Sequence, residues 1–375
     1  MSKRSAVCCA TINSCLFRFR RSLGSIGGTV ILLVLCLLMQ YLLVPQTALA
    51  SNSAVILQYH HFSDQTPPST SISPSLFEQH LEYLAAEDFT VMTLDTIMVY
   101  LRDNRDLPQK CVAITIDDAY RSVYDTAWPL LEKRNWSCTT FVTSQGVDDH
   151  LESYLTWDQM RELAAAGMEF GNHSHSHDYL IQMKPAETPA QWRQRIRTDI
   201  TTCQERLKEE LGIEASSFVY PFGEYNSDLK EIVGELGLIG VGQQSGCLWA
   251  GSDFALIPRY PMSGSFGKMA DFQLKVWTLP LPVIEEIPDD PIILSRSKAP
   301  TLRLRLAPGD YQLTGLACYA SHEGQLDVIW VDREALILEV TANSPLPSGR
   351  SRYNLSAPHE DGGRYFWYSH LWIRP

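Results

Sequence analysis

The stretch CVAITIDD, residues 111–118, is an apolar run that ends on two adjacent carboxylates, Asp117 and Asp118. A short apolar run bounded by a turn is typical of a buried strand. A second short strand is predicted at residues 167–171, and the sequence His-Ser-His-Ser-His follows it at residues 173–177. Two strand ends can therefore bring carboxylates and imidazoles together. One carboxylate and two histidines make a three-ligand set that leaves positions open for water and substrate, as a catalytic zinc requires.

Outward from these motifs, strands and helices are predicted to alternate between residues 54 and 275. The predicted strands cover residues 55–59, 111–117, 138–143, 168–172 and 217–220, and the predicted helices cover residues 75–86, 121–134, 158–166, 191–211 and 228–236. The longest helix has an apolar face at three- and four-residue steps, formed by Ile196, Ile200, Cys203 and Leu207. Strict alternation of strands and helices predicts an α/β fold with a parallel sheet, open or closed.

The pattern changes at residues 279–300, where five prolines predict a linker between residues 51–278 and a second domain. Beyond this segment, leucines alternate with arginines at residues 302–306, and further short strands are separated by turn signals. We therefore expect a small all-β sandwich over residues 301–375. Alternation places Tyr365 and Trp367 in its core.

The first fifty residues differ from the rest of the chain. Residues 1–50 hold five lysines and arginines and no acidic residue, and an apolar run there leads to Ala48-Leu49-Ala50. This pattern predicts a secretory signal peptide cleaved after Ala50, and hence export to the periplasm, the cell envelope or the medium. The apolar run is also just long enough to span a membrane, so a retained anchor is the alternative. Membrane contact is expected only through this segment.

Charge and cysteine content exclude some classes of protein. The chain has a net charge of −12, which argues against binding to nucleic acid, because that needs a basic surface. Beyond residue 50 the cysteines are too few for a dense disulfide framework. Cys111 and Cys138 each begin a predicted strand, so they either form one bridge in an oxidising compartment or remain buried thiols. The sequence leaves the oligomeric state open.

Three motifs in this order resemble the polysaccharide deacetylase family, metal-dependent enzymes that remove N-acetyl groups from chitin-like sugars. They are Asp-Asp at residues 117–118, His-Ser-x-x-His at 173–177 and Tyr-Pro-Phe-Gly at 220–223. The early Tyr-His-His-Phe at residues 59–62 is similar to the branch that deacetylates poly-β-1,6-N-acetylglucosamine in biofilms. The resemblance covers residues 54–275. It implies a distorted (β/α) barrel with a metal at the carboxyl ends of its strands.

The resemblance also implies a metal-ligand set, formed by Asp118, His173 and His177. Residues at i and i+4 lie on one side of a helical turn, so both imidazoles would face the metal. His175 is the competing ligand, because in an extended loop it would share a face with both other histidines. A histidine and carboxylate site accepts several divalent ions, so we expect zinc, with nickel or cobalt as alternatives.

Two further residues are expected to move protons. The resemblance implies that Asp117 is the general base, and a carboxylate beside a dication should stay ionised at neutral pH. In the biofilm branch the general acid is a histidine of the early motif, which His60 matches here. Histidine side chains titrate near neutral pH, which suits a general acid. His61 is the alternative for this role.

The third motif is expected to bind substrate. Tyr220, Pro221 and Phe222 would form a groove wall, and their segment would supply a backbone donor to the developing oxyanion. The family often has an arginine where this chain has Val219. Arg259 is expected to bind substrate, and it could also orient the general base, Asp117, from another direction.

These patterns together predict an exported, metal-dependent N-deacetylase of an N-acetylglucosamine polymer, with a poly-β-1,6-linked chain as the expected substrate. One alternative is a carbohydrate-binding protein that kept the fold without turnover. It is suggested by Val219 at the position of the family's arginine and by the proton donor, because many family members use a histidine late in the domain and this chain has none between His177 and His322. The other is a deacetylase of peptidoglycan or of chitin oligosaccharides.

Overall fold

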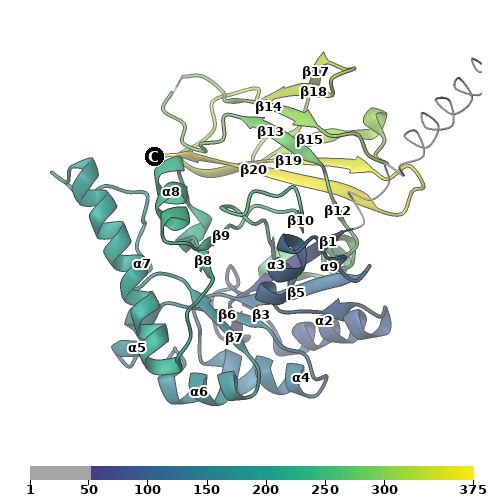
Figure 1. Ribbon diagram of the computed structural model, residues 1–375. Coiled ribbons are helices and arrows are strands. Elements are labelled where there is room, and N and C mark those ends of the chain that lie inside the picture. Colours follow the sequence, from purple (N-terminus) through teal and green to yellow (C-terminus); the bar gives the residue numbers. More distant parts are fainter. Residues whose placement is uncertain (1–51, 296) are drawn as a thin grey trace, which may run out of the picture. The chain divides into compact units, whose positions relative to one another are not determined.

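The computed structural model describes residues 52–295 and 297–375 (Figure 1). The predicted signal segment, residues 1–50, lies outside the described residues. No helix within the described ranges is long and apolar enough to cross a membrane. The described residues form an α/β part built on one large sheet, followed by a part with two smaller β-sheets.

The large sheet has nine strands and curls into a half-barrel. Its main path runs β10-β1-β5-β6-β7-β8-β9, while β11 pairs with β1 and β4 pairs with β5. From β1 through β9 the neighbours on this path are parallel, and the edge strand β10 is antiparallel to β1. The strands are β1 Ser53–Tyr59, β4 Thr90–Val91, β5 Cys111–Ile116, β6 Thr139–Val142, β7 Glu169–Asn172, β8 Ser217–Val219, β9 Ile239–Val241, β10 Cys247–Trp249 and β11 Tyr260–Pro261. A short pair, β2 His61–Phe62 and β3 Ser71–Ile72, follows β1.

Helices connect these strands, as the alternating pattern predicts. They are α2 Pro74–Ala86, α3 Leu94–Arg102, η1 Val123–Ala127, α4 Trp128–Glu132, α5 Ser144–Asp148, α6 Trp157–Ala165, α7 Pro189–Leu211, η2 Pro221–Gly223, α8 Ser227–Glu235, η3 Gly264–Gly267 and α9 Met269–Val276. The longest, α7, is capped at its N-terminus by a capping box between Thr188 and Gln191 and at its C-terminus by Gly212, whose φ of 69° suits glycine. The predicted apolar face of α7 is confirmed, because all four of its residues are buried.

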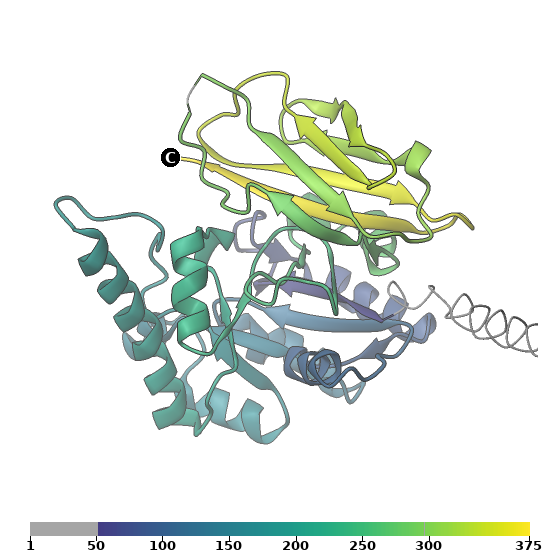
Figure 2. The same cartoon turned by 45° about the horizontal axis from the view of Figure 1, so that its top comes forward.

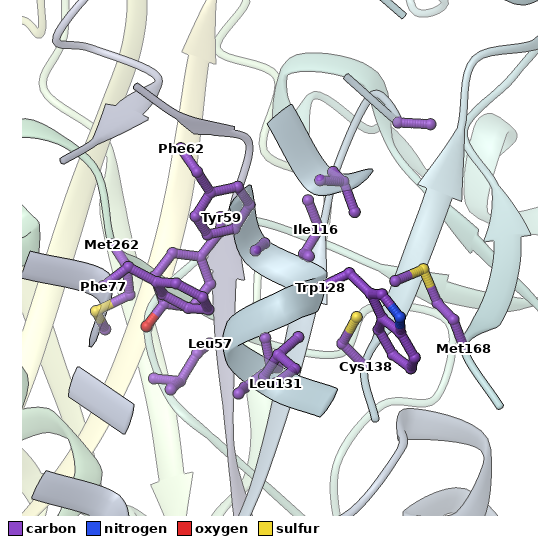
Figure 3. Close-up of a cluster of buried hydrophobic side chains, with 14 of the residues drawn as sticks. Leu57, Tyr59, Phe62, Phe77, Ile116, Trp128, Leu131, Cys138, Met168 and Met262 are labelled. Carbon is purple, nitrogen blue, oxygen red and sulfur yellow. The ribbon is translucent and has the colours of Figure 1, made fainter. Parts of the chain in front are cut away.

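The core of the α/β part lies on both faces of the sheet. Every residue of β5 is buried, as expected for a parallel strand covered on two sides. Figure 3 shows Leu57 and Tyr59 of β1 beside Phe77 of α2, with Trp128 and Leu131 of α4 in the same cluster. This packing fixes the strand ends from which the polar motif residues project.

The C-terminal part is a sandwich of two sheets, seen face to face in Figure 2. One sheet has the order β12-β20-β19-β15-β16 and the other β13-β14-β18-β17. The strands are β12 Leu279–Pro280, β13 Val283–Ile287, β14 Thr301–Leu306, β15 Ala317–Ala320, β16 Gly324–Leu326, β17 Val328–Asp332, β18 Ile337–Thr341, β19 Gly349–Pro358 and β20 Tyr365–Arg374; η4, Leu313–Gly315, precedes β15. Both sheets contribute to one core, for example Leu304 of β14 and Leu355 of β19.

Two expectations about this part need correction. Residues 279–300 are not simply a linker, because β12 pairs with β20 and β13 pairs with β14 inside this range. In β20 the alternation has the opposite phase to the one expected: Phe366 is fully buried, whereas Tyr365 is 42% exposed.

The two cysteines considered for a bridge remain free thiols, and both are buried. The register of β5 and β6 explains this, because Thr139 pairs with Thr115, four residues beyond Cys111. Cys138 precedes β6 and is therefore far along the sheet from Cys111. Burial raises the pKa of each thiol to about 12.

Candidate active site

The predicted site residues lie at the carboxyl ends of neighbouring parallel strands. His60 follows β1, Asp117 and Asp118 follow β5, His173 follows β7, and Phe222 comes after β8. Carboxyl ends of parallel strands meet at one edge of a sheet, which is where sites form on such folds. The sheet order therefore brings together residues as distant in the chain as His60 and Phe222, which are 162 positions apart.

Asp118, His173 and His177 converge. Asp118 Oδ1 lies 3.4 Å from Nε2 of His173 and 3.4 Å from Nε2 of His177. Their ligand atoms all lie within 4.8 Å of one another, and in residues 52–295 and 297–375 this is the only such group of three or more metal-binding side chains. Asp118 adopts a φ of 71°, a left-handed conformation that non-glycine residues rarely adopt and that often marks a functional site.

The donor set fits a divalent metal. Two ligands about 2.0–2.1 Å from a tetrahedral Zn²⁺ are roughly 3.3 Å apart, close to the separations seen here. His173 Nδ1 lies 2.9 Å from the carbonyl oxygen of Val219, so a proton on Nδ1 is held there and Nε2 keeps its lone pair for a metal. Burial, followed by the neighbouring His173, lowers the pKa of His177 to about 4, so this imidazole is neutral at pH 7.

The competing histidine points elsewhere. His175 Nδ1 lies 2.9 Å from the hydroxyl of Ser144, and His175 is absent from the converging group. The expected helical turn does not form: residues 173–177 are an irregular loop with a positive φ at Ser174 (67°) and His177 (54°). A hydrogen bond from the His177 amide to Ser174 Oγ, at 2.9 Å, stabilises the conformation of this loop. These turns, rather than helical spacing, place His173 and His177 on one side.

Asp117 is fully buried and tightly held. Its two carboxylate oxygens accept from Nη1 and Nη2 of Arg259 at 2.7 and 2.8 Å, and Oδ2 also accepts from Gln58 Nε2 at 2.7 Å. Burial would raise the pKa of Asp117, but the Arg259 guanidinium lowers it to about 2. The carboxylate is therefore ionised at neutral pH and fixed in one orientation.

Arg259 has no exposed surface, so its assignment to substrate binding is corrected and its orienting role is favoured. Besides Asp117, its guanidinium donates to the carbonyl of Gly242 at 2.9 Å and to Thr115 Oγ1 at 3.0 Å. Arg259 directly precedes β11, which pairs with β1, so it approaches Asp117 from a different strand than the one carrying Val219.

Of the two early histidines, His60 faces the candidate base. Its Nε2 lies 3.8 Å from Asp117 Oδ2, and its side chain is 16% exposed. His60 Nδ1 is buried without a hydrogen-bond partner among the described residues. His61 instead stacks on Tyr120 with ring centroids 3.6 Å apart, and burial lowers its pKa.

The third motif divides into buried and accessible residues. Tyr220 is fully buried and its hydroxyl donates to the carbonyl of Ala255 at 2.8 Å, so it does not form a groove wall. Pro221 is also buried, which corrects the second expected substrate contact. Phe222 is half-buried, has a φ of 59°, and places its ring 4.6 Å from that of His177.

Sequence reasoning missed two residues of this site. Gln58, which donates a hydrogen bond to Asp117, could have been found from the sequence, because it is a polar residue inside the buried strand β1 and buried polar groups need partners. Tyr179 stacks on Phe222 with ring centroids 4.2 Å apart and is 47% exposed, so it extends an aromatic surface outward from His177. No sequence pattern distinguishes this tyrosine from other exposed ones.

Comparisons with known proteins find similar sequences and structures. Residues 104–241 match the family described as polysaccharide deacetylase. The poly-β-1,6-N-acetyl-D-glucosamine N-deacetylase of Escherichia coli (strain K12) is 26% identical over 221 residues, which cover 50% of this chain and 33% of that protein. The protein of the same name from Staphylococcus aureus (strain MRSA252) is 23% identical over 231 residues, covering 56% of this chain and 79% of that protein.

Among solved structures, that of IcaB from Ammonifex degensii superposes with a TM-score of 0.53 at 27% identity, covering 60% of this chain and 100% of that one. This confirms the predicted fold of the α/β part. The chain spans only about a third of the E. coli protein, so the likeness concerns a domain and not the whole relative.

Proposed function

Because this chain carries a polysaccharide deacetylase domain, we propose that it hydrolyses N-acetyl groups of a poly-β-1,6-N-acetylglucosamine-like polymer and releases acetate. The substrate is proposed from the names of the E. coli and S. aureus relatives and from the place of His60 in the early motif. Export of the mature chain after removal of residues 1–50 is part of the proposal, since such a polymer lies outside the cytoplasm.

The convergence at one sheet edge carries the proposal. Asp118, His173 and His177 form an open three-ligand set, and Asp117 and His60 stand beside it without being needed as ligands. A protein that only binds sugar has no use for an open metal site flanked by a held carboxylate and a partly exposed imidazole. Amide hydrolysis needs both features.

A divalent ion held by the three ligands would supply Lewis acidity for both the attacking water and the acetyl carbonyl. Asp117 would accept the proton of the attacking water. With a pKa of about 2 its basicity is low, so its fixed position, set by Arg259 and Gln58, is what it contributes. His60 would donate a proton to the leaving amine from its place 3.8 Å from the same carboxylate.

The ligand set supports zinc as the proposed ion. Two imidazole nitrogens and one carboxylate oxygen are common ligands of catalytic zinc, and nickel or cobalt would also accept them. The ring of Phe222 covers one side of His177, and Tyr179 continues this aromatic surface. We propose that the two rings flank the sugar that carries the acetyl group, in place of Tyr220 and Pro221.

Acetate release from purified protein tests the proposal. The substrates are β-1,6-linked and β-1,4-linked N-acetylglucosamine oligomers and peptidoglycan, each assayed with zinc, with a chelator, and with zinc restored after chelation. We expect zinc-dependent release that is fastest with the β-1,6-linked oligomer. Faster acetate release from a β-1,4-linked substrate would mean that the preferred polymer is β-1,4-linked and not β-1,6-linked. Binding of an oligomer with no release from any substrate would favour a carbohydrate-binding protein.

A further inference from the structure

A second cavity lies away from the metal-ligand cluster, where the α/β part meets the C-terminal sheets. Its volume is about 450 Å³, in the usual range for small-molecule sites. One wall comes from the edge strand β10 and residues 251–258, and the other comes from residues 280–289 and β20. None of the proposed ligands or proton-transfer residues lines it.

The cavity wall is acidic. Four carboxylates and one lysine line it, and two of the carboxylates are already paired. Asp253 lies 2.7 Å from Lys230 Nζ, and Glu285 lies 2.7 Å from Nε of Arg305. The other two carboxylates therefore determine which charge the cavity attracts.

Glu286 and Asp289 are these two carboxylates. In the part of the chain that the structure describes, neither forms an ion pair with a lysine or arginine. Glu286 accepts a hydrogen bond from the Tyr368 hydroxyl, and its Oε2 lies 3.3 Å from Nδ1 of His370. The Glu286 side chain is 23% exposed and Asp289 is exposed, so both can meet a ligand that enters from solvent. Two carboxylates without a lysine or arginine partner favour a cationic ligand.

Buried polar atoms around the cavity also lack partners. His370 is 2% exposed and Gln244 is 6% exposed, yet His370 Nε2 and Gln244 Oε1 have no hydrogen-bond partner among the described residues. The indole Nε1 of Trp367 is also buried without a hydrogen-bond partner among the described residues. Buried donors and acceptors are normally satisfied, so these three atoms call for hydrogen-bonding groups from a ligand or from ordered water.

The remaining lining residues fit a sugar. Trp249, Trp367 and Tyr368 supply aromatic surface, and Ser245 and Ser252 supply hydroxyl groups. A metal ion is a poorer fit, because the described residues contain no second group of three metal-binding side chains besides the one at the sheet edge. An organic cation that also carries hydroxyl groups satisfies all of these observations.

We propose that this cavity is a second saccharide site, which binds a glucosamine unit whose amine is free and protonated. Glu286 and Asp289 would pair with the ammonium group, and the unpartnered atoms of His370, Gln244 and Trp367 would bond to ring hydroxyls. The choice of this sugar rests on the proposed function, because N-deacetylation creates such units on the polymer. The site would retain a processed chain while the metal-ligand cluster acts on neighbouring units.

Isothermal titration calorimetry with the exported chain tests the site without relying on turnover. The ligands are a fully deacetylated β-1,6-glucosamine oligomer and its fully acetylated counterpart, the latter titrated into the Asp118→Asn variant so that it is not consumed. We expect the deacetylated oligomer to bind more tightly, and to bind equally well to wild type and to Asp118→Asn. Equal affinity for both oligomers, or loss of binding in Asp118→Asn, would overturn the proposal.

Charge-removing variants locate the site. Glu286→Gln and Asp289→Asn should each weaken binding of the deacetylated oligomer about tenfold, since each loses a hydrogen bond to a charged group, and Glu286→Gln should also reduce the preference over the acetylated oligomer. Glu339→Gln removes the same charge from β18, outside the cavity, where Glu339 pairs with Arg303. It should change neither the affinity for the deacetylated oligomer nor the preference over the acetylated one. Unchanged binding in both cavity variants would overturn the proposal. If the protein releases no acetate but still binds the deacetylated oligomer in a way that depends on Glu286, the second site is supported and only the deacetylase function is contradicted.

Discussion

Replacing Arg259 by methionine should destabilise the fold strongly, because it leaves a buried carboxylate without its cation. Arg259 and Asp117 both have 0% side-chain exposure, and two hydrogen bonds of 2.7 and 2.8 Å join them. Methionine has a similar length and no charge. The variant therefore removes the ion pair and the bonds to Gly242 and Thr115 while roughly keeping the volume.

The expected loss is about 3 kcal/mol at pH 7. Removing one partner of a buried ion pair typically costs about 3–5 kcal/mol. The fall of the Asp117 pKa from 3.8 to about 2 gives a smaller value, on the order of 2 kcal/mol for the charged form. Because the folded pKa lies below the ordinary one, this contribution is present above pH 3.8 and is lost as the pH falls through about 2.

Urea denaturation with a chelator present measures this difference without a contribution from metal binding. The gap between wild type and Arg259→Met should narrow from pH 7 toward pH 4, because the unpaired carboxyl of the variant can take up a proton. The control is Arg303→Met, since Arg303 is 49% exposed and its pair with Glu339 should contribute less than about 1 kcal/mol. If Arg259→Met and Arg303→Met unfold at the same urea concentration, the buried pair does not stabilise the fold as argued.

The other predictions concern the site and the N-terminus. His177→Ala should abolish Zn²⁺ binding in calorimetry while His175→Ala should retain it, because the His175 ring bonds outside the ligand cluster; the reverse result would exchange their roles. Asp117→Asn and His60→Ala should stay folded and metal-loaded but release acetate about a hundred- to ten-thousandfold more slowly, and full activity of His60→Ala would remove its role as the acid. Mass spectrometry of the exported protein should find Ser51 as its first residue, and an intact N-terminus in the membrane fraction would indicate an anchor.

The sequence predicted best what depends on local pattern and on strand ends. The apolar run 111–116 is a buried strand, and the carboxylates that follow it lie at the sheet edge beside His173. The convergence of these residues could be predicted because a parallel sheet brings the carboxyl ends of all its strands to one edge, whatever the conformation of the loops. The loop at residues 173–177 was less predictable, since positive φ angles at two non-glycine residues follow from tertiary contacts and not from local preference.

Long-range partners were predicted poorly. Arg259 lies 142 positions from Asp117, and only the pairing of β11 with β1 brings them together. Edge strands in a proline-rich segment are equally difficult to identify, as β12 and β13 show, because proline is tolerated where one side of a strand is unpaired. In β20 the phase of burial is set across the strand pair, where Phe366 faces Ala357, and successive aromatic residues conceal that phase in the sequence.

One segment connects the two proposed sites. Gly242 and Gln244 offer backbone carbonyls to Arg259, the first to Nε and the second to the backbone amide, both at 2.9 Å. The side chain of Gln244 lines the second cavity, and its amide donates to the carbonyl of Leu256 at 2.9 Å. The residues that fix Asp117 are therefore continuous with the wall of the cavity, within a stretch of fewer than twenty residues. A sugar bonded to Gln244 would therefore contact the same segment that holds Arg259 against Asp117.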